Sequence, residues 1–165
     1  MARLEPVDGG LRLQLAADEV DVVAALAEGL AARLDDAAAP GAGPDDAVVA
    51  QLAPVVSRGD ADVDAELRAL LRGDLLASRV GRLHDLVELL RSAPDGACDR
   101  VLDRDTAMRI VESLNDLRVA LGATVGYDRI EGEQRPTDGP AAETLALMDA
   151  LGWLQGGLIE FVMEG

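Results

Sequence analysis

The sequence predicts a mainly helical α+β fold in which an N-terminal β-hairpin packs on a bundle of four or five helices. Three observations lead to this prediction. The chain has 165 residues, 49% of them apolar, which is enough for one domain built around a core. Aromatic residues make up only 2%, so Leu, Val and Ala must fill that core, as suits helices packed on helices. The apolar period also changes from two residues near the N-terminus to three or four residues afterwards.

The first expected element is a β-hairpin over residues 3 to 15, because apolar and polar residues alternate on either side of Asp8-Gly9-Gly10. One face of its second strand carries Leu11, Leu13 and Leu15. An amphipathic helix then begins with Asp18 as N-cap and ends at Asp35-Asp36. Its apolar face consists of Val20, Val23, Leu26, Leu30 and Leu34.

The middle of the chain is predicted to contain a loop and three helical segments. Residues 35–46 combine Gly, Pro, Ala and acids, which is typical of a flexible loop, and a short helix over 46–53 ends at Pro54. A helix after Asp60 runs to about Arg72 and is expected to break near Gly73. The next helix begins at Asp74, and its apolar positions form a seam for another helix: Leu76, Val80, Leu83, Val87 and Leu90.

The last third of the chain is expected to add one strand and two long helices. Pro94-Asp95-Gly96 closes the preceding segment, and residues 98–102 are interpreted as an edge strand for the hairpin. A helix capped by Asp103 ends at Gly122, a natural C′ residue. A second flexible loop covers 128–139, and Pro140 opens the final helix. Residues 1–165 are therefore predicted to form a single domain.

The charge balance excludes some classes of partner. There are 31 acidic residues against 15 basic ones, all Arg, which gives a net charge of −16. Such a charge repels phosphate backbones and anionic membranes, so we expect no direct nucleic-acid binding and a protein partner instead. The surface expected to meet an acidic partner is the Arg-bearing central region, which consists of Arg68, Arg72, Arg79, Arg82, Arg91, Arg104 and Arg109.

A cytoplasmic location without membrane contact is the expectation from the apolar runs. The N-terminus has Glu5 and Asp8 before any long apolar segment, which is not the order of a secretory signal. Charged residues interrupt every run before it reaches eighteen apolar residues, so no membrane span is predicted.

No catalytic, cofactor or metal site is predicted. Asp60-Ala-Asp-Val-Asp-Ala-Glu66 opens like a calcium loop, but Ala65 stands where the turn needs Gly and Leu71 where the loop needs Glu. His84 is the only histidine and has no second His or nearby Cys with which to bind zinc. A catalytic pair of His84 with Cys98, Ser78 or Ser92 is not predicted either, because the sequence has no nucleophile-elbow signature at these residues. The segment 122–126 lacks the third Gly and the preceding strand of a phosphate loop.

Cys98 is the only cysteine, so no disulfide can form within the chain. Two interpretations of its thiol remain open. Arg100 favours a reactive thiolate and Asp99 opposes it, which leaves Cys98 as a candidate redox thiol. The alternative is a small apolar filler in the edge strand.

Two segments carry a resemblance to a known family. They are Leu114-Asn-Asp-Leu-Arg-Val-Ala-Leu-Gly122 and Met148-Asp-Ala-Leu-Gly-Trp-Leu-Gln-Gly-Gly-Leu158. Together with the opening Gly10-Leu-Arg-Leu-Gln-Leu15, they resemble a small actinobacterial family of unknown function that is often encoded beside the Clp protease adaptor. One branch of that family is the oxidative-stress transcriptional regulator AosR, which is thought to sense oxidants with a Cys-x-x-x-Cys pair and to act with an alternative sigma factor on cysteine-biosynthesis genes.

The resemblance implies a non-enzymatic regulatory protein whose partner is a sigma factor or RNA polymerase, with a stress-response role. The chain departs from the AosR branch at the thiol pair, because the residues four away from Cys98 are Pro94 and Leu102. A single thiol can still oxidise to sulfenic acid or link two chains. Two alternatives stay open: an accessory of the Clp machinery, and an enzyme with an unrecognised site.

Asn115, Asp116 and Arg118 form a polar motif in the segment 114–122, where they lie around a helix whose other side is apolar. The motif has two interpretations, as a structural tie or as a site of interaction with a partner. We expect Asn115 to bond a loop backbone and Arg118 to bridge to a carboxylate such as Asp149, which would tie the two long helices together. Trp153 is expected at the packing centre, with partner anchoring as the alternative. Exposed parts of the 76–90 seam or of the last helix could form a symmetric homodimer.

Overall fold

The computed structural model describes residues 2–39, 41–42, 45–54, 63–127 and 135–164, with side chains for all of these except 63–68. Within them the fold is mainly helical, with a small antiparallel sheet and five helices, as predicted. In chain order the elements are β1 (Arg3–Val7), β2 (Gly10–Leu15), α1 (Ala17–Ala38), α2 (Ala47–Leu52), α3 (Val63–Leu90), β3 (Cys98–Leu102), α4 (Arg104–Val125) and α5 (Gly139–Met163).

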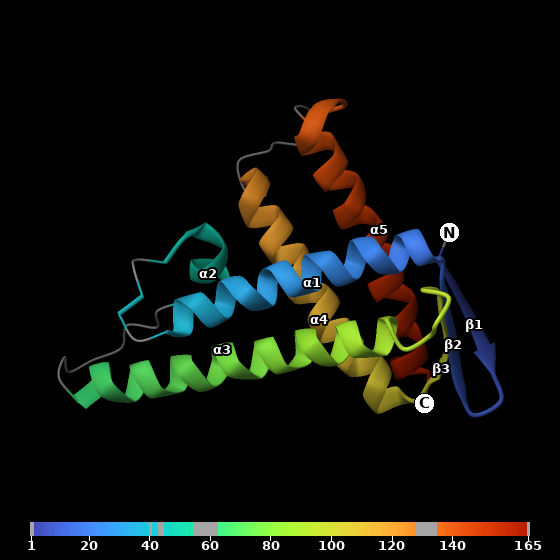
Figure 1. Ribbon diagram of the computed structural model, residues 1–165, viewed down its shortest axis with the longest axis horizontal. Helices are drawn as coiled ribbons and strands as arrows, with labels where there is room; N and C mark the ends of the chain where they lie inside the picture. The colour runs from blue at the N-terminus through green and yellow to red at the C-terminus, as the bar shows by residue number, and fades with distance from the viewer. Residues whose placement is uncertain (1, 40, 43–44, 55–62, 128–134, 165) are drawn as a thin grey trace.

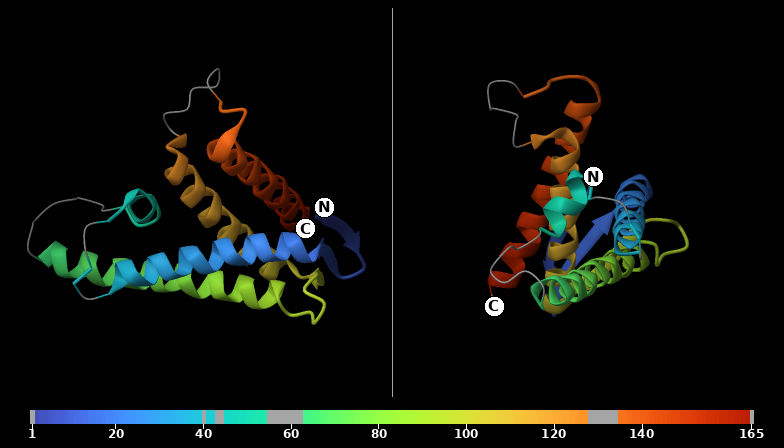
Figure 2. Two further views of the ribbon diagram at one scale, coloured as in Figure 1. Left: turned by 45° about the horizontal axis from the view of Figure 1, so that its top comes forward. Right: turned by 90° about the vertical axis from the view of Figure 1, so that its left-hand side faces the viewer.

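The helices form two antiparallel pairs that cross each other (Figures 1 and 2). α1 lies along α3, and α4 lies along α5. α2 packs on the side of α4 with Val48, Val49 and Leu52 buried. One apolar cluster joins both pairs to the sheet, which lies near the start of α1 and the end of α3 (Figure 1). α4 therefore contacts each of the other helices.

The sheet has the strand order β1-β2-β3, so the predicted edge strand pairs with the hairpin as expected. β2 is the central strand, and its alternate leucines face the core. Its register with β3 sets Leu11 opposite Leu102 and Leu15 opposite Cys98. On the solvent face, Nε and Nη2 of Arg12 donate to the two carboxylate oxygens of Asp99, each at 2.7 Å. Hydrogen bonds from Arg12 and Gln14 lower the pKa of Asp99 to about 2.

α1 differs from the prediction at both ends. Its N-cap is Ala16 and not Asp18, because the Glu19 carboxylate reaches back to accept hydrogen bonds from the backbone N–H of Ala16 at 2.9 Å and of Ala2 at 2.7 Å. The helix also passes Asp35 and Asp36 and ends at Ala38, since Ala37 still packs against the core. The predicted loop 35–46 is thus helical over its first four residues, and the predicted short helix is present with Asp46 as N-cap.

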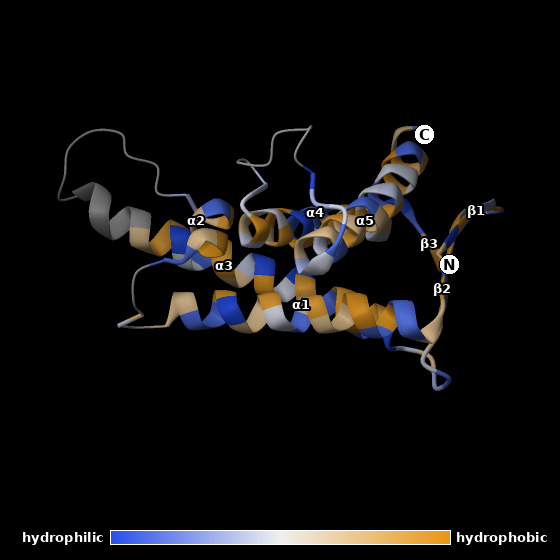
Figure 3. Ribbon diagram, turned by 90° about the horizontal axis from the view of Figure 1, so that it is seen from above, coloured by the Kyte–Doolittle hydropathy of each residue, from blue (hydrophilic) through white to orange (hydrophobic). Residues whose placement is uncertain are grey.

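α3 is one continuous helix, so the predicted break near Gly73 is wrong. A single glycine costs a helix only about 1 kcal/mol relative to alanine, and the apolar seam that begins at Leu76 packs on α1 and outweighs it. Of the predicted seam, Leu76, Val80, Leu83 and Leu90 are buried within the chain and Val87 is half-buried, while Leu86, outside the predicted seam, is buried as well. In Figure 3, hydrophobic and hydrophilic residues alternate along α1 and α3, as is typical of amphipathic helices.

Replacing Gly73 with alanine is expected to raise the free energy of unfolding by about 0.5–1 kcal/mol. A Cβ atom at Gly73 would have no heavy atom within 4 Å, so the gain in helix propensity is not offset by a clash. Urea unfolding followed by circular dichroism measures the change. Gly81→Ala, in the same helix and equally unobstructed, should give a gain of similar size. A loss of stability at Gly73 would mean that α3 bends there.

α4 ends at Val125 and not at Gly122, and its left-handed C-cap is Gly126, with φ of 63°. Gly122 lies inside the helix because α5 passes close to it: a Cβ atom there would lie 3.4 Å from Cε of Met148. The glycine therefore serves helix packing instead of helix termination. Of the predicted loop 128–139, residues 128–134 lie outside the described residues.

α5 is the most apolar helix and is long and apolar enough to cross a membrane by length and composition. The expectation that no such segment exists rested on unbroken apolar runs. α5 is interrupted by charged residues, but an 18-residue stretch of it has at most two of them and a mean hydropathy of 1.3. Within the chain it packs along α4 through Leu145, Met148, Leu151, Leu154 and Leu158. α5 thus packs against α4 through one face, while its other face is exposed.

Candidate site in the groove between α2, α4 and α5

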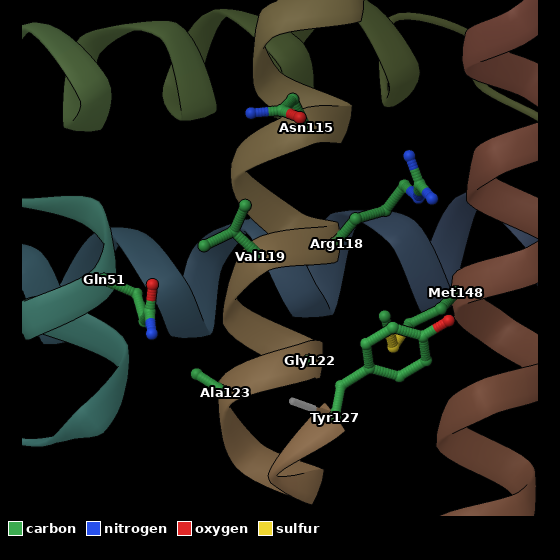
Figure 4. A pocket seen from close by; sticks show the side chains of 8 residues that line it. All are labelled: Gln51, Asn115, Arg118, Val119, Gly122, Ala123, Tyr127 and Met148. Atoms are coloured by element: carbon green, nitrogen blue, oxygen red, sulfur yellow. The ribbon is translucent and has the colours of Figure 1, made fainter. Parts of the chain in front are cut away.

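A groove of about 300 Å³ lies where α2, the C-terminal half of α4 and α5 come together (Figure 4). Its lining comprises Gln51 from α2, Asn115, Arg118, Val119, Gly122 and Ala123 from α4, Tyr127, and Met148 from α5. Two of the residues singled out in the sequence, Asn115 and Arg118, therefore line one surface. The groove has an apolar floor and a polar rim with a single charged side chain, that of Arg118.

Gln155 holds Arg118 in place. Nη1 of Arg118 donates to Oε1 of Gln155 at 2.7 Å, and Nε2 of Gln155 donates to the backbone carbonyl of Val111 at 3.3 Å. Gln155 is only 8% exposed, so its amide is fixed by packing as well as by these two bonds. Gly152 of α5 lies next to the guanidinium, since a Cβ atom there would be 3.4 Å from it. The positive charge is thus held at a defined place on the α4–α5 boundary.

The predicted bridge from Arg118 to Asp149 is wrong. Asp149 is exposed and pairs with Arg135 instead, on the outer side of α5. Asn115 is exposed at the groove and makes no hydrogen bond to another described residue, so the predicted bond to a loop backbone is also absent there. The tie between the two long helices exists, but an amide and not a carboxylate makes it.

Arg118 differs from the other half-buried arginines in the described part of the chain. Arg12, Arg72, Arg79 and Arg82 are also half buried, and each pairs with a carboxylate. Arg118 has no carboxylate partner among the described residues. Its Nε is buried without a hydrogen-bond acceptor, as are those of Arg72, Arg79 and Arg82. The only hydrogen-bond partner of the Arg118 guanidinium among the described residues is therefore the neutral amide of Gln155.

Asp116 faces the opposite way, toward α3. It is 1% exposed, and its two carboxylate oxygens accept hydrogen bonds from Arg79 and Arg82, the latter at 3.2 Å. Ser113, also buried, donates to the backbone carbonyl of Arg82 at 3.3 Å. Asp116 thus has the structural role expected for a buried polar tie, but between α4 and α3 and not between α4 and α5.

The Arg-bearing central region does not form a free basic surface where it is described. Its arginines face acidic or aromatic groups of the same chain: Arg72 with Asp45, Arg79 and Arg82 with Asp116, Arg91 with Glu28, Arg109 with Asp85, and Arg104 over the Phe161 ring. The side chain of Arg68 lies outside the described residues. The sequence could not reveal this, because the acids that pair with these arginines come from distant segments.

Trp153 is on the surface, so its predicted place at the packing centre is wrong. Its side chain is 55% exposed on α5, and the nearby Leu151 and Leu154 take the core positions. Ile159 and Met163 on the same helix are also exposed. Trp153 does not line the groove, which makes its face of α5 a second candidate surface.

Cys98 is buried at 2% exposure at the start of β3. Burial raises the pKa of its thiol, Asp99 raises it further, and Arg100 lowers it. The environment is that of an apolar filler, because a protonated and inaccessible thiol reacts slowly with oxidants.

Cys98 in the folded protein is therefore expected to react with Ellman's reagent at least about a hundredfold more slowly than in urea, because the reagent must wait for local opening. Cys98→Ser should retain the circular dichroism spectrum and melting temperature to within a few degrees. Equal reaction rates in the folded and unfolded protein would show an accessible thiol and favour the redox interpretation.

The remaining residues considered for chemistry lie apart. His84 is exposed on α3, and Ser92 Oγ donates to the Leu89 carbonyl while it accepts from Nε of Arg100 at 2.9 Å. Asp60 and Asp62 of the calcium-like segment lie outside the described residues. Within the described ranges, no three His, Cys, Asp or Glu side chains are grouped so as to hold a metal ion.

Sequence reasoning missed Gln51, Tyr127 and Met148 as groove residues, and Gln155 as the residue that holds Arg118. One signal for Gln155 was present: it occupies a core position of the last helix, between Leu151 and Leu158 at helical spacing. A polar residue at such a position needs a buried hydrogen-bond partner. No comparable signal marks Gln51, whose position depends on how α2 docks on α4.

The groove and the exposed face of α5 lie within the region that is similar to a known family. No curated protein and no solved structure matches the chain. A family model described as a domain of unknown function, DUF2017, matches residues 1–162. The match covers every helix and strand but the last residue of α5, and the chain therefore belongs to the DUF2017 family.

Proposed function

We propose that this protein is a non-enzymatic regulator that acts by binding another protein through the exposed face of α5 around Trp153. The observation that supports the proposal is the exposure of the only tryptophan of the chain on a helix whose outer side also carries Ile159 and Met163. Tryptophan is the residue most enriched at the energetic centres of protein interfaces. A net charge of −16 disfavours nucleic acid and anionic membranes as partners.

The resemblance to the AosR-type oxidative-stress regulators suggests that the partner is a sigma factor or RNA polymerase in the cytoplasm. The proposal includes no disulfide switch, since Cys98 is the only cysteine and is buried. The purified protein alone is expected not to bind duplex DNA specifically at physiological salt.

Crosslinking and co-purification from the native cell tests the proposal. Recovery of RNA polymerase or a sigma factor with the wild-type chain supports regulation of transcription, whereas recovery of Clp subunits instead would assign the protein to proteolysis. A second copy of the chain as the only crosslinked species would identify the α5 face as a homodimer contact and overturn the proposal.

Trp153→Ala is expected to lower recovery of the partner at least about tenfold, as for a central interface residue. The fold should be unchanged because the side chain is mostly exposed. Met108→Ala removes an exposed apolar side chain from α4 and serves as the matched control, for which recovery should stay at the wild-type level. Equal recovery with Trp153→Ala would show that the α5 face does not carry the interaction.

A further inference from the structure

We propose that the groove between α2, α4 and α5 binds a segment of a protein partner through an acidic side chain, whose carboxylate pairs with Arg118. The proposal takes the nature of the ligand, a polypeptide, from the proposed function. It concerns a different surface, since Trp153 does not line the groove.

The charge of Arg118 is the first step. A half-buried guanidinium stabilises the fold least when no anion is near, and the other half-buried arginines of the described chain each have a carboxylate. Gln155 holds the Arg118 guanidinium in place, and its amide oxygen is the only hydrogen-bond partner of Arg118 among the described residues. An arginine fixed in this way is suited to pair with an incoming carboxylate, because little side-chain entropy remains to be lost.

The polar rim is the second step. Gln51 on α2 and Asn115 on α4 are both exposed and lie on either side of Val119 (Figure 4). Each amide offers both a donor and an acceptor, which is the combination that pairs with a peptide backbone. A small carboxylate ion would use Arg118 alone and would leave these two amides to water.

The apolar floor is the third step. Val119, Ala123 and Met148 contribute apolar side chains to the lining, with Met148 next to the ring of Tyr127 (Figure 4). The volume of about 300 Å³ matches an apolar side chain next to an acidic one and is near the lower limit of ligand pockets. The expected ligand is therefore a short motif with one Glu or Asp flanked by Leu-like residues.

The net charge of the protein makes the test selective. With −16 overall, the long-range field repels an acidic peptide, so any preference for a carboxylate over its neutral isostere must come from a local positive group. Within the groove lining, that group is Arg118.

The experiment uses the full chain with ¹³C-labelled methionine methyl groups and NMR titration with two capped tripeptides, acetyl-Leu-Glu-Leu-amide and acetyl-Leu-Gln-Leu-amide. The glutamate peptide should shift the methyl resonance of Met148 and bind about tenfold or more tightly than the glutamine peptide, as expected for one charge-assisted pair. Titration to about 10 mM covers the weak affinity of a tripeptide.

Arg118→Gln should abolish the preference for the glutamate peptide, and Arg118→Lys, which keeps the charge, should retain part of it and serves if the first variant does not fold. Arg135→Gln removes the same charge from an exposed site on the far side of Asp149 and should leave the preference intact. Equal binding of the two peptides, a preference that survives Arg118→Gln, or absence of any shift at Met148 would overturn the proposal.

A third ligand, 4-methylpentanoate, separates a peptide site from a site for small carboxylates. It should bind at least about tenfold more weakly than the glutamate peptide, because it cannot use the two amides. Equal affinity would overturn the assignment to a polypeptide. The titration and the Trp153→Ala co-purification have separate readouts, so either can fail while the other succeeds.

Discussion

Asp116→Ala is expected to lower the free energy of unfolding by about 3–5 kcal/mol, the typical cost of removing one partner from a buried ion pair. The carboxylate is 1% exposed, and Arg79 and Arg82 converge on it from α3. Without it, Arg79 loses its carboxylate partner, and Arg82 keeps only the half-exposed Glu112 at 3.4 Å. Urea unfolding followed by circular dichroism measures the loss, which is a large part of the stability of an ordinary domain.

Asp85→Ala is the matched control. Asp85 pairs with Arg109 at 3.5 Å, but both side chains are more than half exposed, so the expected loss is below about 1 kcal/mol. If Asp116→Ala does not fold, the triple variant Arg79→Met, Arg82→Met, Asp116→Leu should fold, because replacing the whole ionic group with apolar side chains removes the unpaired charge. A loss within about 1 kcal/mol for Asp116→Ala would contradict the role assigned to it.

Gly10→Ala is expected to cost about 2–3 kcal/mol through overpacking between β2 and β3. A Cβ atom at Gly10 would overlap the backbone carbonyl of Leu102 and press on Val101. A backbone group cannot rotate away as the end of a side chain can, so β3 must shift, and Leu102 is a buried core residue.

The control for Gly10 is its neighbour Gly9, where a Cβ atom would meet nothing within 4 Å but φ is +87°. Gly9→Asn should cost less than about 1 kcal/mol, since Asn tolerates positive φ better than most residues. If Gly10→Ala lowers the free energy of unfolding no more than Gly9→Asn does, β2 and β3 separate freely at Gly10.

The architecture could be predicted because its signals are local. Alternation in the hairpin, the helical period of the long segments and the strand at 98–102 all depend on residues close in sequence, and the structure confirms each. The errors fall at helix ends and at Gly73. There a weak local preference competes with packing from a distant element, such as Met148 against Gly122.

The candidate site was less accessible to sequence reasoning. Asp116 and Arg118 were singled out, but their partners Arg79, Arg82 and Gln155 lie 34 or more residues away, on α3 and α5. Sequence pattern does not tell which of several acids or amides an arginine meets across a helix boundary. The exposure of Trp153 was missed for a related reason: an apolar helix such as α5 has more apolar faces than the core can cover.

The position of the indole at the surface also has a consequence for spectroscopy. Because Trp153 is already mostly in water in the folded chain, its fluorescence should change little in wavelength when the chain unfolds in denaturant. The same emission should move toward the blue when another molecule covers α5. Intrinsic fluorescence is thus a poor reporter of folding for this protein and a sensitive reporter of docking.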